Sequence, residues 1–554
     1  MAFPPYSKKS AFGLLWLALS AASLGFYGKV VTSDLSRQGL HYDVALHGVR
    51  MMGPTLGDPS WEEREDEPRL TVGENSFPLM FNDYNGAVES YLGPLPALLI
   101  DGPTAFGLNA AGVVWGYVLL GMAGGAAYFF YGSIWAAPAL WAALGTNPSF
   151  VAFSRIGIYA GTIHGALFAT ALCLLFLFWK REGSAWVLTG SAAAMGLALG
   201  SRTLMLWYAI AVLIMIAWTP DLRRKISETP RRTRAAALGA LLSGPLLILT
   251  ANIRGDWFTF RFFAQHLVTS REGISNAAYL RNLGERIREF ISLWDATAWT
   301  NINHPNRLGP GLIALAVLWL IGLHGYGKLK KDGGSFQGLW PVGICLAVLM
   351  QSPFTPTFLD VHHLSALFVP AALIFIAPLF IPIPYRGKRY LRIIYGGIAL
   401  CFMALNFQLF REFQPHRHIH GGEDTKWNVM ADVVDYLQKN DVHSIGLGDT
   451  GLMDPFDYLS GRKIQAEEIF HAPYGDMTRA ESEELLRRRL REEETGYYLF
   501  KHPSVRRLPY DTRFLEIVSG EGRRAEVIKL FVSPESKPVF VLYKVIPFRK
   551  EPAG

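Results

Sequence analysis

The sequence contains little cysteine and little charge, and both shortages restrict what the protein can be. The three cysteines among 554 residues, Cys173, Cys345 and Cys401, lie within apolar stretches, so the long polar segments have none for disulfide bonds. Charged residues make up 18% of the chain, whereas a soluble protein carries about 25%. Half of the residues are hydrophobic. The composition therefore predicts an integral membrane protein.

Apolar stretches of about 20 residues recur along the chain and predict transmembrane helices. The first follows Lys8 and Lys9 as in a signal peptide, but it is long and no small-residue cleavage site follows it. We therefore interpret it as a membrane helix. The third and ninth are short. The eleven candidate spans are 11–30, 108–130, 133–150, 160–179, 185–201, 204–219, 235–253, 309–327, 337–352, 363–384 and 393–411.

Five basic clusters fall in alternate loops between the predicted spans. The positive-inside bias assigns all five to the cytoplasm and the remaining loops to the outer side. The formal net charge of +7 is therefore a sign of membrane topology and does not indicate a nucleic-acid surface. The clusters are Lys8/Lys9, Lys180/Arg181, Arg223 to Arg234, Lys328/Lys330/Lys331 and Arg386 to Arg392.

The predicted fold is a polytopic α-helical membrane protein of about 11 transmembrane helices with a C-terminal extracytoplasmic α/β domain. Residues 1–411 form the transmembrane domain, with large outer loops at 31–107 and 254–308. Residues 412–554 form the outer domain, because helical and strand patterns alternate there. We expect helices at Trp427–Gln438 and 480–494, and strands at Ser444–Leu447, Tyr497–Phe500, Val527–Val532 and Val539–Val545.

The first outer loop begins with a pattern typical of an amphipathic helix, from Leu40 to Met52. Asp43, His47 and Arg50 follow one another at i, i+4 and i+7 and would share a polar face. Such a helix could lie on the membrane and present a carboxylate to a lipid-bound reactant. The alternative is a surface helix with a solvated face.

The same loop continues with a segment that is too polar to span a membrane and too apolar to lie free in water. It runs from Phe77 to Leu92, contains Asp83, Tyr84 and Glu89, and leads into a proline-broken stretch. A re-entrant or interfacial helix fits both properties.

The loop thus has an acidic residue after the first span, and a Pro-Leu-Met…Tyr-x-Gly-Ala…Tyr-Leu…Pro segment that starts at Pro78. With these two features the sequence resembles the bacterial glycosyltransferases of the GT-C class, which use lipid-linked sugars. Relatives in this class include protein O-mannosyltransferases, the aminoarabinose transferase acting on lipid A, and rhizobial lipopolysaccharide glycosyltransferases. Further similar motifs are Ser154–Gly157, Gly200–Arg202, His362–Leu364 with Pro370, and Asp457–Gly461.

The resemblance implies an acid at the first site, and we predict Asp43 as the general base, with Asp34 as the alternative. The family usually has a pair of acids there, whereas this sequence has one. Asp83 or Glu89 would supply the second catalytic carboxylate. One carboxylate is a weak site for a metal, so no cofactor is predicted, with a divalent cation as the alternative.

The expected chemistry explains the other candidate residues. A carboxylate would take the proton from the acceptor hydroxyl, and cations would hold the phosphate on which charge develops. Arg155 and Arg202 suit a phosphate through their planar forks, although both could be rim anchors. His164 could equally be a core histidine. The remaining predicted substrate-binding residues are His47, Tyr84, His362 and His363.

The sequence thus predicts a membrane glycosyltransferase, hexosyl- or pentosyl-transferring, that moves a sugar from a polyprenyl-phosphate donor to an envelope glycolipid, polysaccharide or protein. The reaction would take place on the outer face of the plasma (inner) membrane, and nucleic acid is not an expected partner. The alternative is a membrane transporter or a lipid-linked glycan flippase. The lack of internal repeats and the position of the charges at the outer rim argue against transport.

The predicted topology can be tested by labelling single cysteines in intact spheroplasts. Cysteines at Ser60 and Ser482 should react with an impermeant thiol reagent, because both segments are expected outside. A cysteine at Ser227 should not react, because it lies in a basic loop. Labelling at Ser227 would reverse the orientation.

Overall fold

The computed structural model describes most of the chain. The described residues are 6–33, 35–41, 44–49, 69–72, 75–80, 85–102, 104–156, 161–181, 184–270, 273–298, 300, 304–329, 336–355, 359–381, 388–410, 428–449, 451–470, 479–492, 495–504 and 510–547. The chain divides into two compact units. The first comprises 1–33, 64–93 and 111–414, and the second comprises 34–63, 94–110 and 415–554.

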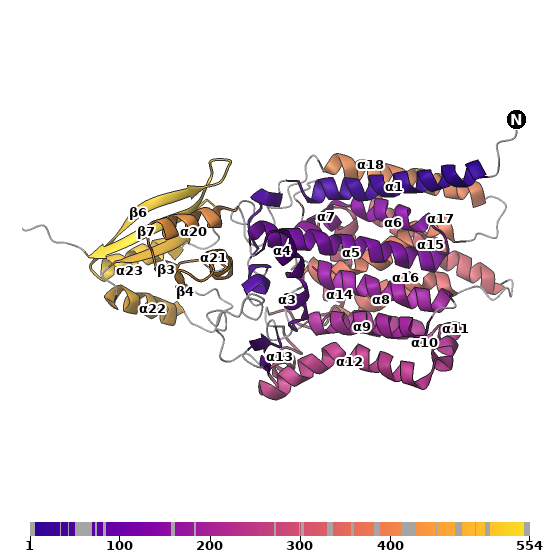
Figure 1. Cartoon of the computed structure of the whole chain (residues 1–554), viewed down its shortest axis with the longest axis horizontal. Coiled ribbons are helices and arrows are strands. Elements are labelled where there is room, and N and C mark those ends of the chain that lie inside the picture. The colour runs from indigo at the N-terminus through magenta and orange to yellow at the C-terminus, as the bar shows by residue number, and fades with distance from the viewer. Residues whose placement is uncertain are drawn as a thin grey trace, which may run out of the picture. The chain divides into compact units, whose positions relative to one another are not determined.

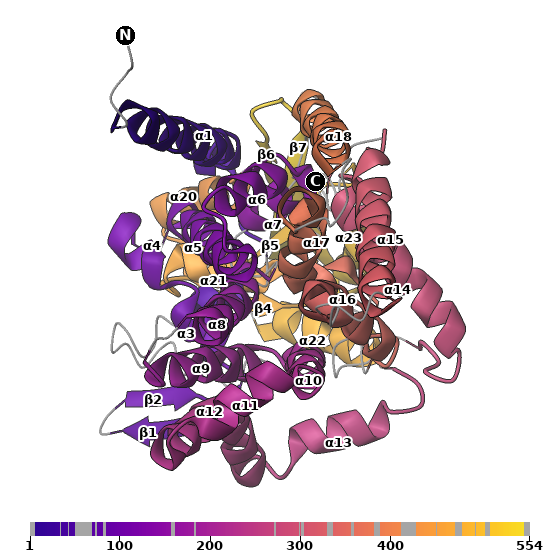
Figure 2. The same ribbon diagram turned by 90° about the vertical axis from the view of Figure 1, so that its right-hand side faces the viewer.

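The first unit is a bundle whose long helices run roughly parallel, as the side view and the end-on view show (Figure 1, Figure 2). A short hairpin, β1 (Arg69–Val72) with β2 (Asn75–Pro78), belongs to the same unit. The long helices are α1 (Tyr6–Val31), α5 (Ala105–Tyr131), α8 (Thr162–Lys180), α12 (Arg231–Arg254), α15 (Leu308–Leu329) and α18 (Lys388–Leu409). The shorter ones are α3 (Val88–Leu92), α6 (Ala136–Gly145), α7 (Pro148–Arg155), α9 (Trp186–Ser201), α10 (Met205–Ala217), α11 (Pro220–Glu228), α13 (Phe258–Gln265), α14 (Tyr279–Trp294), η3 (Phe336–Leu339), α16 (Trp340–Gln351), η4 (Val361–Leu367) and α17 (Phe368–Phe380).

A helix occupies each of the eleven ranges predicted to span a membrane, and the helical membrane fold is confirmed. Among the described residues, seven helices are long and apolar enough to cross a membrane, or eight if the bent pair α10 and α11 is one span. The other apolar helices are shorter. The predicted span 133–150, for example, divides into α6 and α7, because Asn147 caps α7 by accepting from the Phe150 N–H and Pro148 starts it.

Close backbone contacts at glycines hold α3, α9 and α12 together. A Cβ on Gly244 of α12 would lie 1.9 Å from the carbonyl oxygen of Gly196 in α9. A Cβ on Gly86, just before α3, would lie 2.0 Å from the carbonyl oxygen of Gly200. Only glycine permits such contacts, as at other close helix crossings in membranes. The end of α9 is therefore fixed beside α3, where Glu89 and Arg202 lie.

The second unit contains a five-stranded sheet in the order β4-β3-β5-β7-β6, and the predicted α/β alternation of the C-terminal segment is confirmed. β3 pairs in parallel with β4 and β5, and β7 pairs antiparallel with β5 and β6. The strands are β3 (Ser444–Leu447), β4 (Gln465–Glu468), β5 (Gly496–Lys501), β6 (Arg523–Val532) and β7 (Pro538–Pro547). The other elements of this unit are η1 (Leu35–Arg37), α4 (Leu95–Ile100), α20 (Val429–Lys439), α21 (Met453–Ser460), α22 (Arg479–Glu492) and α23 (Tyr510–Gly520).

Two apolar clusters pack on the sheet and stabilise this α/β region. One joins α20 and α21 to β3, and the other joins α22 and α23 to β5 and β7. Ser482 on α22 is only 2% exposed. It is therefore a poor position for the thiol reagent, and the exposed Ser504, after β5, is the better labelling site for the C-terminal segment.

Three carboxyl groups meet where the parallel strands β3 and β4 end. Asp449 follows β3, Glu468 ends β4, and Asp454 lies in the first turn of α21. Burial and the charges of Asp454 and Asp449 raise the pKa of Glu468 to about 7, although Lys501 opposes them. Asp449 is held by the backbone N–H of Lys501, which donates to Oδ2 at 2.6 Å.

The sheet should therefore lose stability as the pH rises. The folded domain holds a proton on Glu468 up to about pH 7, whereas an unfolded chain releases it near the usual pKa of 4.5. The protonated Glu468 contributes its full stabilisation below the unfolded-state pKa of 4.5, and this stabilisation is lost as the pH rises through the folded-state pKa of about 7. Glu468→Gln should remove this dependence, as measured by pulse proteolysis of the C-terminal region of the full chain at about pH 5.5 and about pH 8.5. Glu492, which is exposed at the end of α22, supplies a control, Glu492→Gln. Equal pH dependence of wild type and Glu468→Gln would contradict the assignment.

Candidate active site

A buried ion pair between Glu89 and Arg202 lies at the end of α9 in the first unit. Arg202 Nε donates to Glu89 Oε2 at 2.9 Å, and the two side chains are 4% and 2% exposed. Glu89 Oε1 lies 3.6 Å from Nδ1 of His164. The carboxylate thus lies between a guanidinium and an imidazole, which balances charge that would otherwise be costly to bury.

The backbone around His164 is adapted to this packing. Gly161 adopts φ 94°, and a Cβ there would lie 2.1 Å from Ser365 Oγ and 2.7 Å from His164 Nε2. The same nitrogen lies 3.2 Å from Ser365 Oγ, within hydrogen-bonding distance. His164 thereby connects Glu89 to the η4 segment. The core role that the sequence allowed for His164 and a role in the site are both compatible with this position.

The η4 segment brings His362 and His363 into the same region. The backbone N–H of His362 donates to Asp360 Oδ1 at 3.3 Å, and its Nδ1 lies 3.3 Å from the same oxygen. The two imidazole rings are 4.2 Å apart between centroids. Tyr208 on α10 donates its hydroxyl to the His363 carbonyl oxygen at 3.1 Å. Both histidines are buried, and the charge of Arg202 acts on both.

A second buried arginine, Arg286 on α14, completes the cluster. Its Nη2 lies 3.4 Å from Nδ1 of His363. Because arginine can only donate, Nδ1 accepts and the proton of a neutral His363 is on Nε2. Arg286 also donates to the carbonyl oxygens of Ser352 at 3.1 Å and Asp360 at 3.0 Å, and to Glu289 at 2.7 Å. These bonds fix the guanidinium in place.

Glu289, the ion-pair partner of Arg286, is itself largely buried, and its pKa reflects that burial. Burial raises the pKa of the Glu289 carboxyl, and the ion pair with Arg286 opposes the rise. Sequence reasoning missed Arg286. The available signal was the position of Arg286 on an amphipathic helix. Arg286 lies on the buried side of α14 together with Asn282, Leu293 and Trp294.

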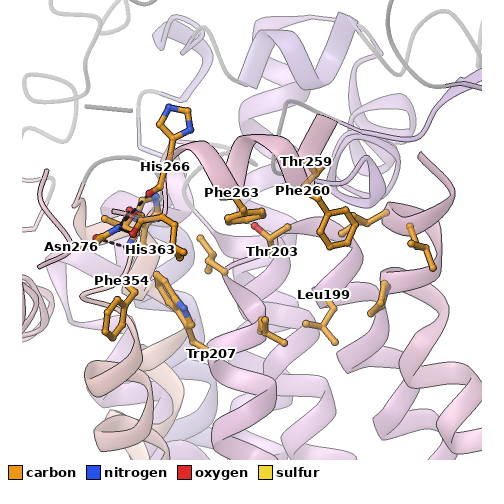
Figure 3. A pocket seen from close by; sticks show the side chains of 17 residues that line it. Leu199, Thr203, Trp207, Thr259, Phe260, Phe263, His266, Asn276, Phe354 and His363 are labelled. Atoms are coloured by element: carbon orange, nitrogen blue, oxygen red, sulfur yellow. Dashed lines mark hydrogen bonds between the residues drawn. The ribbon is translucent and has the colours of Figure 1, made fainter. Parts of the chain in front are cut away.

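An apolar cavity of about 540 Å³ opens beside this cluster. Figure 3 shows His363, Asn276 and His266 grouped on one side, and the aromatic rings of Trp207, Phe260 and Phe263 around the rest. Arg286 lies over the Trp207 ring, 5.9 Å from its centroid. The lining residues are Leu199, Thr203, Leu204, Leu206, Trp207, Pro245, Ile248, Leu249, Thr259, Phe260, Phe263, His266, Leu267, Asn276, Phe354, Thr355 and His363. The cavity is therefore suited to a hydrocarbon chain whose polar end lies near His363.

The structure brings four of the predicted site residues together: Glu89, Arg202, His362 and His363. Arg155 is buried on α7, and its Nη1 donates to the Val30 carbonyl oxygen at 3.1 Å. His47 is also buried, but it belongs to the second unit. Asp43, Asp83, Tyr84 and the alternative Asp34 lie outside the described residues.

The described part of the chain contains no group of three or more histidine, cysteine or acidic residues arranged to hold a metal ion. The cluster contains the guanidinium groups of Arg202 and Arg286 and the imidazole rings of His362 and His363, and such groups can bind an anion. The predicted acids Asp43 and Asp83 lie outside the described residues, so the divalent cation stays an alternative.

Glu89→Gln should destabilise the protein by about 3–5 kcal/mol, because it leaves the buried Arg202 charge without its carboxylate. The double variant Glu89→Gln/Arg202→Met should recover part of this loss, since it removes both charges. Thermal unfolding in detergent measures both effects. The exposed pair Arg288–Glu285 on α14 is the matched control, and Arg288→Gln should cost less than about 1 kcal/mol. A Glu89→Gln protein as stable as wild type would mean that the ion pair does not balance the buried charge.

No protein-family model and no curated protein sequence matches the chain, whereas solved structures do. ArnT from Cupriavidus metallidurans bound to undecaprenyl phosphate aligns with a TM-score of 0.58 at 11% identity, covering 96% of this chain and 98% of ArnT. The apo state of ArnT gives 0.57 at 10% identity, covering 97% and 98%. Arabinofuranosyltransferase AftD from Mycobacteria aligns at 0.42 with 13% identity, covering 96% of this chain and 41% of AftD, which is too distant for any inference. The chain therefore has the fold of ArnT over nearly its whole length, and the GT-C fold predicted from the sequence is confirmed.

Proposed function

We propose that the protein is a glycosyltransferase that takes its sugar from a polyprenyl-phosphate donor. The observation that carries this proposal is the combination of a buried cationic cluster with an apolar cavity next to it. A polyprenyl phosphate has the same two parts, an anion joined to a long hydrocarbon. ArnT, which has the same fold, has been crystallised with undecaprenyl phosphate.

The phosphate would lie near Arg202, His362 and His363, with Arg286 behind His363. Glu89 holds the Arg202 guanidinium through Nε. Its plane is therefore already oriented, and a planar fork binds phosphate oxygens in pairs. Charge that develops on the phosphate as the sugar leaves would be stabilised by groups that need not move. Glu89 is then a positioning residue for Arg202, although its predicted role as a second catalytic carboxylate stays open.

The hydrocarbon chain would occupy the cavity lined by α9, α10, α12 and α13. Its volume of about 540 Å³ lies within the usual range for ligand pockets. It accommodates the isoprene units nearest to the phosphate. Burial of these units would favour binding by roughly 25 cal/mol per Å² of apolar surface. The phosphate would join the hydrocarbon chain near His363, which borders both the cavity and the cluster.

Asp43 is the proposed general base, with Asp34 as the alternative, and Asp83 the proposed second carboxylate. His47, Tyr84 and Arg155 are proposed to contact the substrates. A hexosyl or pentosyl group would pass to an envelope glycolipid, polysaccharide or protein. The reaction would take place on the outer face of the plasma membrane, with the C-terminal domain also outside, which is the orientation that the basic loops predict.

The function can be tested by analysing envelope glycans and lipid-linked sugars in cells that lack the protein. We expect one sugar to vanish from the envelope and its lipid-linked form to accumulate. Wild type and Asp34→Asn should restore the sugar. Asp43→Asn should not, because loss of a general base reduces the rate roughly 10²–10⁴-fold.

The variants also distinguish the parts of the proposal. Restoration by Asp43→Asn with failure of Asp34→Asn would transfer the role of base to Asp34. Unchanged glycans and unchanged lipid-linked sugars in the deletion strain would contradict the glycosyltransferase assignment itself. Blotting of the membrane fraction checks that each variant is present in equal amount.

A further inference from the structure

The junction of α10, α11 and α12 forms a basic surface at the end of the bundle where the N-terminal end of α1 also lies (Figure 1). α10 and α11 meet at 93°, so α11 lies across the axis of α10. Lys225 of α11 donates to the carbonyl oxygens of Arg181 at 2.8 Å and Trp179 at 3.4 Å, which fixes α11 to the end of α8. Nearby Trp186 and Trp218 are 61% and 64% exposed, as is typical of tryptophans at a membrane interface.

The charge of this junction is strongly positive. Between Thr219 and Arg234 there are six basic and two acidic residues. Asp221 pairs with Arg224. Arg231, Arg232 and Arg234 are exposed in the first turn of α12. Cations are unfavourable at a helix N-terminus, where the backbone N–H groups already favour an anion. An anion bound here would offset the repulsion among the arginines and their unfavourable interaction with the helix N-terminus.

An apolar crevice of about 250 Å³ leads from these arginines into the bundle. It shares no lining residue with the larger cavity. Arg234 is the charged residue among the side chains that line it, and Leu213 and Leu238 at its edge are 53% and 57% exposed. Its lining residues belong to α8, α9, α10, α11 and α12.

We propose that the crevice binds an anionic phospholipid of the leaflet on the basic side, with an acyl chain between α8, α9, α10 and α12 and the phosphate at Arg231 and Arg234. The exposed leucines place the opening where lipid chains surround the bundle. The arginines lie at the level of the headgroups, because α11 crosses the end of α10 there. Basic pockets between transmembrane helices on the cytoplasmic side favour anionic headgroups in this way.

This site is separate from the candidate active site. α9 carries the crevice residues Leu188, Ala192 and Met195 in its first part, whereas its last residue, Ser201, adjoins Arg202. Met195, the crevice residue of α9 nearest to Ser201, lies six residues before it, about 9 Å along the helix. The proposed headgroup site at Arg234 lies eleven residues, about 16 Å, from Pro245, the first residue of α12 that lines the larger cavity. The phospholipid would therefore not compete with the proposed sugar donor. It would instead stabilise the packing of α9, α10 and α12, which also line the larger cavity.

The proposal can be tested with the purified full chain in vesicles that contain a photoreactive phospholipid, with the reactive group in the acyl chain. Phosphatidylglycerol should label Ala192, Met195 or Leu213, as identified by mass spectrometry of the peptides. Phosphatidylcholine with the same acyl chain should label them several-fold less. Arg231→Gln and Arg234→Gln should each weaken labelling by phosphatidylglycerol about fivefold. Ala192→Phe should block it by filling the crevice.

Arg389→Gln is the matched control, because Arg389 is an exposed arginine near the start of α18, outside the crevice. It should leave labelling unchanged. Equal labelling by the two lipids, or labelling spread evenly over the lipid-facing helices, would overturn the proposal. Competition by unlabelled phosphatidylglycerol against the wild-type protein gives a result that does not depend on the folding of any variant. Failure of unlabelled phosphatidylglycerol to compete better than phosphatidylcholine would also overturn it.

Discussion

The buried charge of Arg202 is the constraint on which the arrangement of the first unit depends. A guanidinium buried inside a membrane-embedded bundle needs a partner, and Glu89 of α3 provides a carboxylate beside Arg202. α3 can approach only because Gly86 meets the backbone of Gly200 without a side chain. The ion pair and the glycine contact therefore support each other.

The carboxylate that pairs with Arg202 also lies next to a histidine, and the histidines extend the polar network. His164 connects Glu89 to Ser365, and His363 connects η4 to Arg286. Five segments that are far apart in the chain thus contribute to one polar network beside the apolar cavity. A network in which buried polar groups have partners is rigid, and rigid donors bind an anion without the cost of reorganisation.

The helical fold and much of the C-terminal region could be predicted from the sequence, because both depend on local patterns. Apolar stretches mark the helices, and the strands β3, β5, β6 and β7 coincide with β-branched and aromatic stretches. β4 was missed, because Gln465–Glu468 is polar and forms a strand only through its parallel pairing with β3. Its carboxylate Glu468 was missed for the same reason. The third predicted span, 133–150, was recognised as short, but its division into α6 and α7 before Pro148 was not predicted.

The sequence by itself determined the membrane class, the positions of the helices and the residue types suited to a phosphate, because hydrophobicity and charge are properties of neighbouring residues. It singled out Arg202, His362 and His363 but could not decide between anchoring, capping and binding. Only the tertiary structure paired Arg202 with Glu89, added Arg286 from α14 and formed the cavity beside His363. Those outcomes depend on contacts between residues far apart in the chain, such as Glu89 and Arg202, which are 113 positions apart, and no local pattern encodes such contacts.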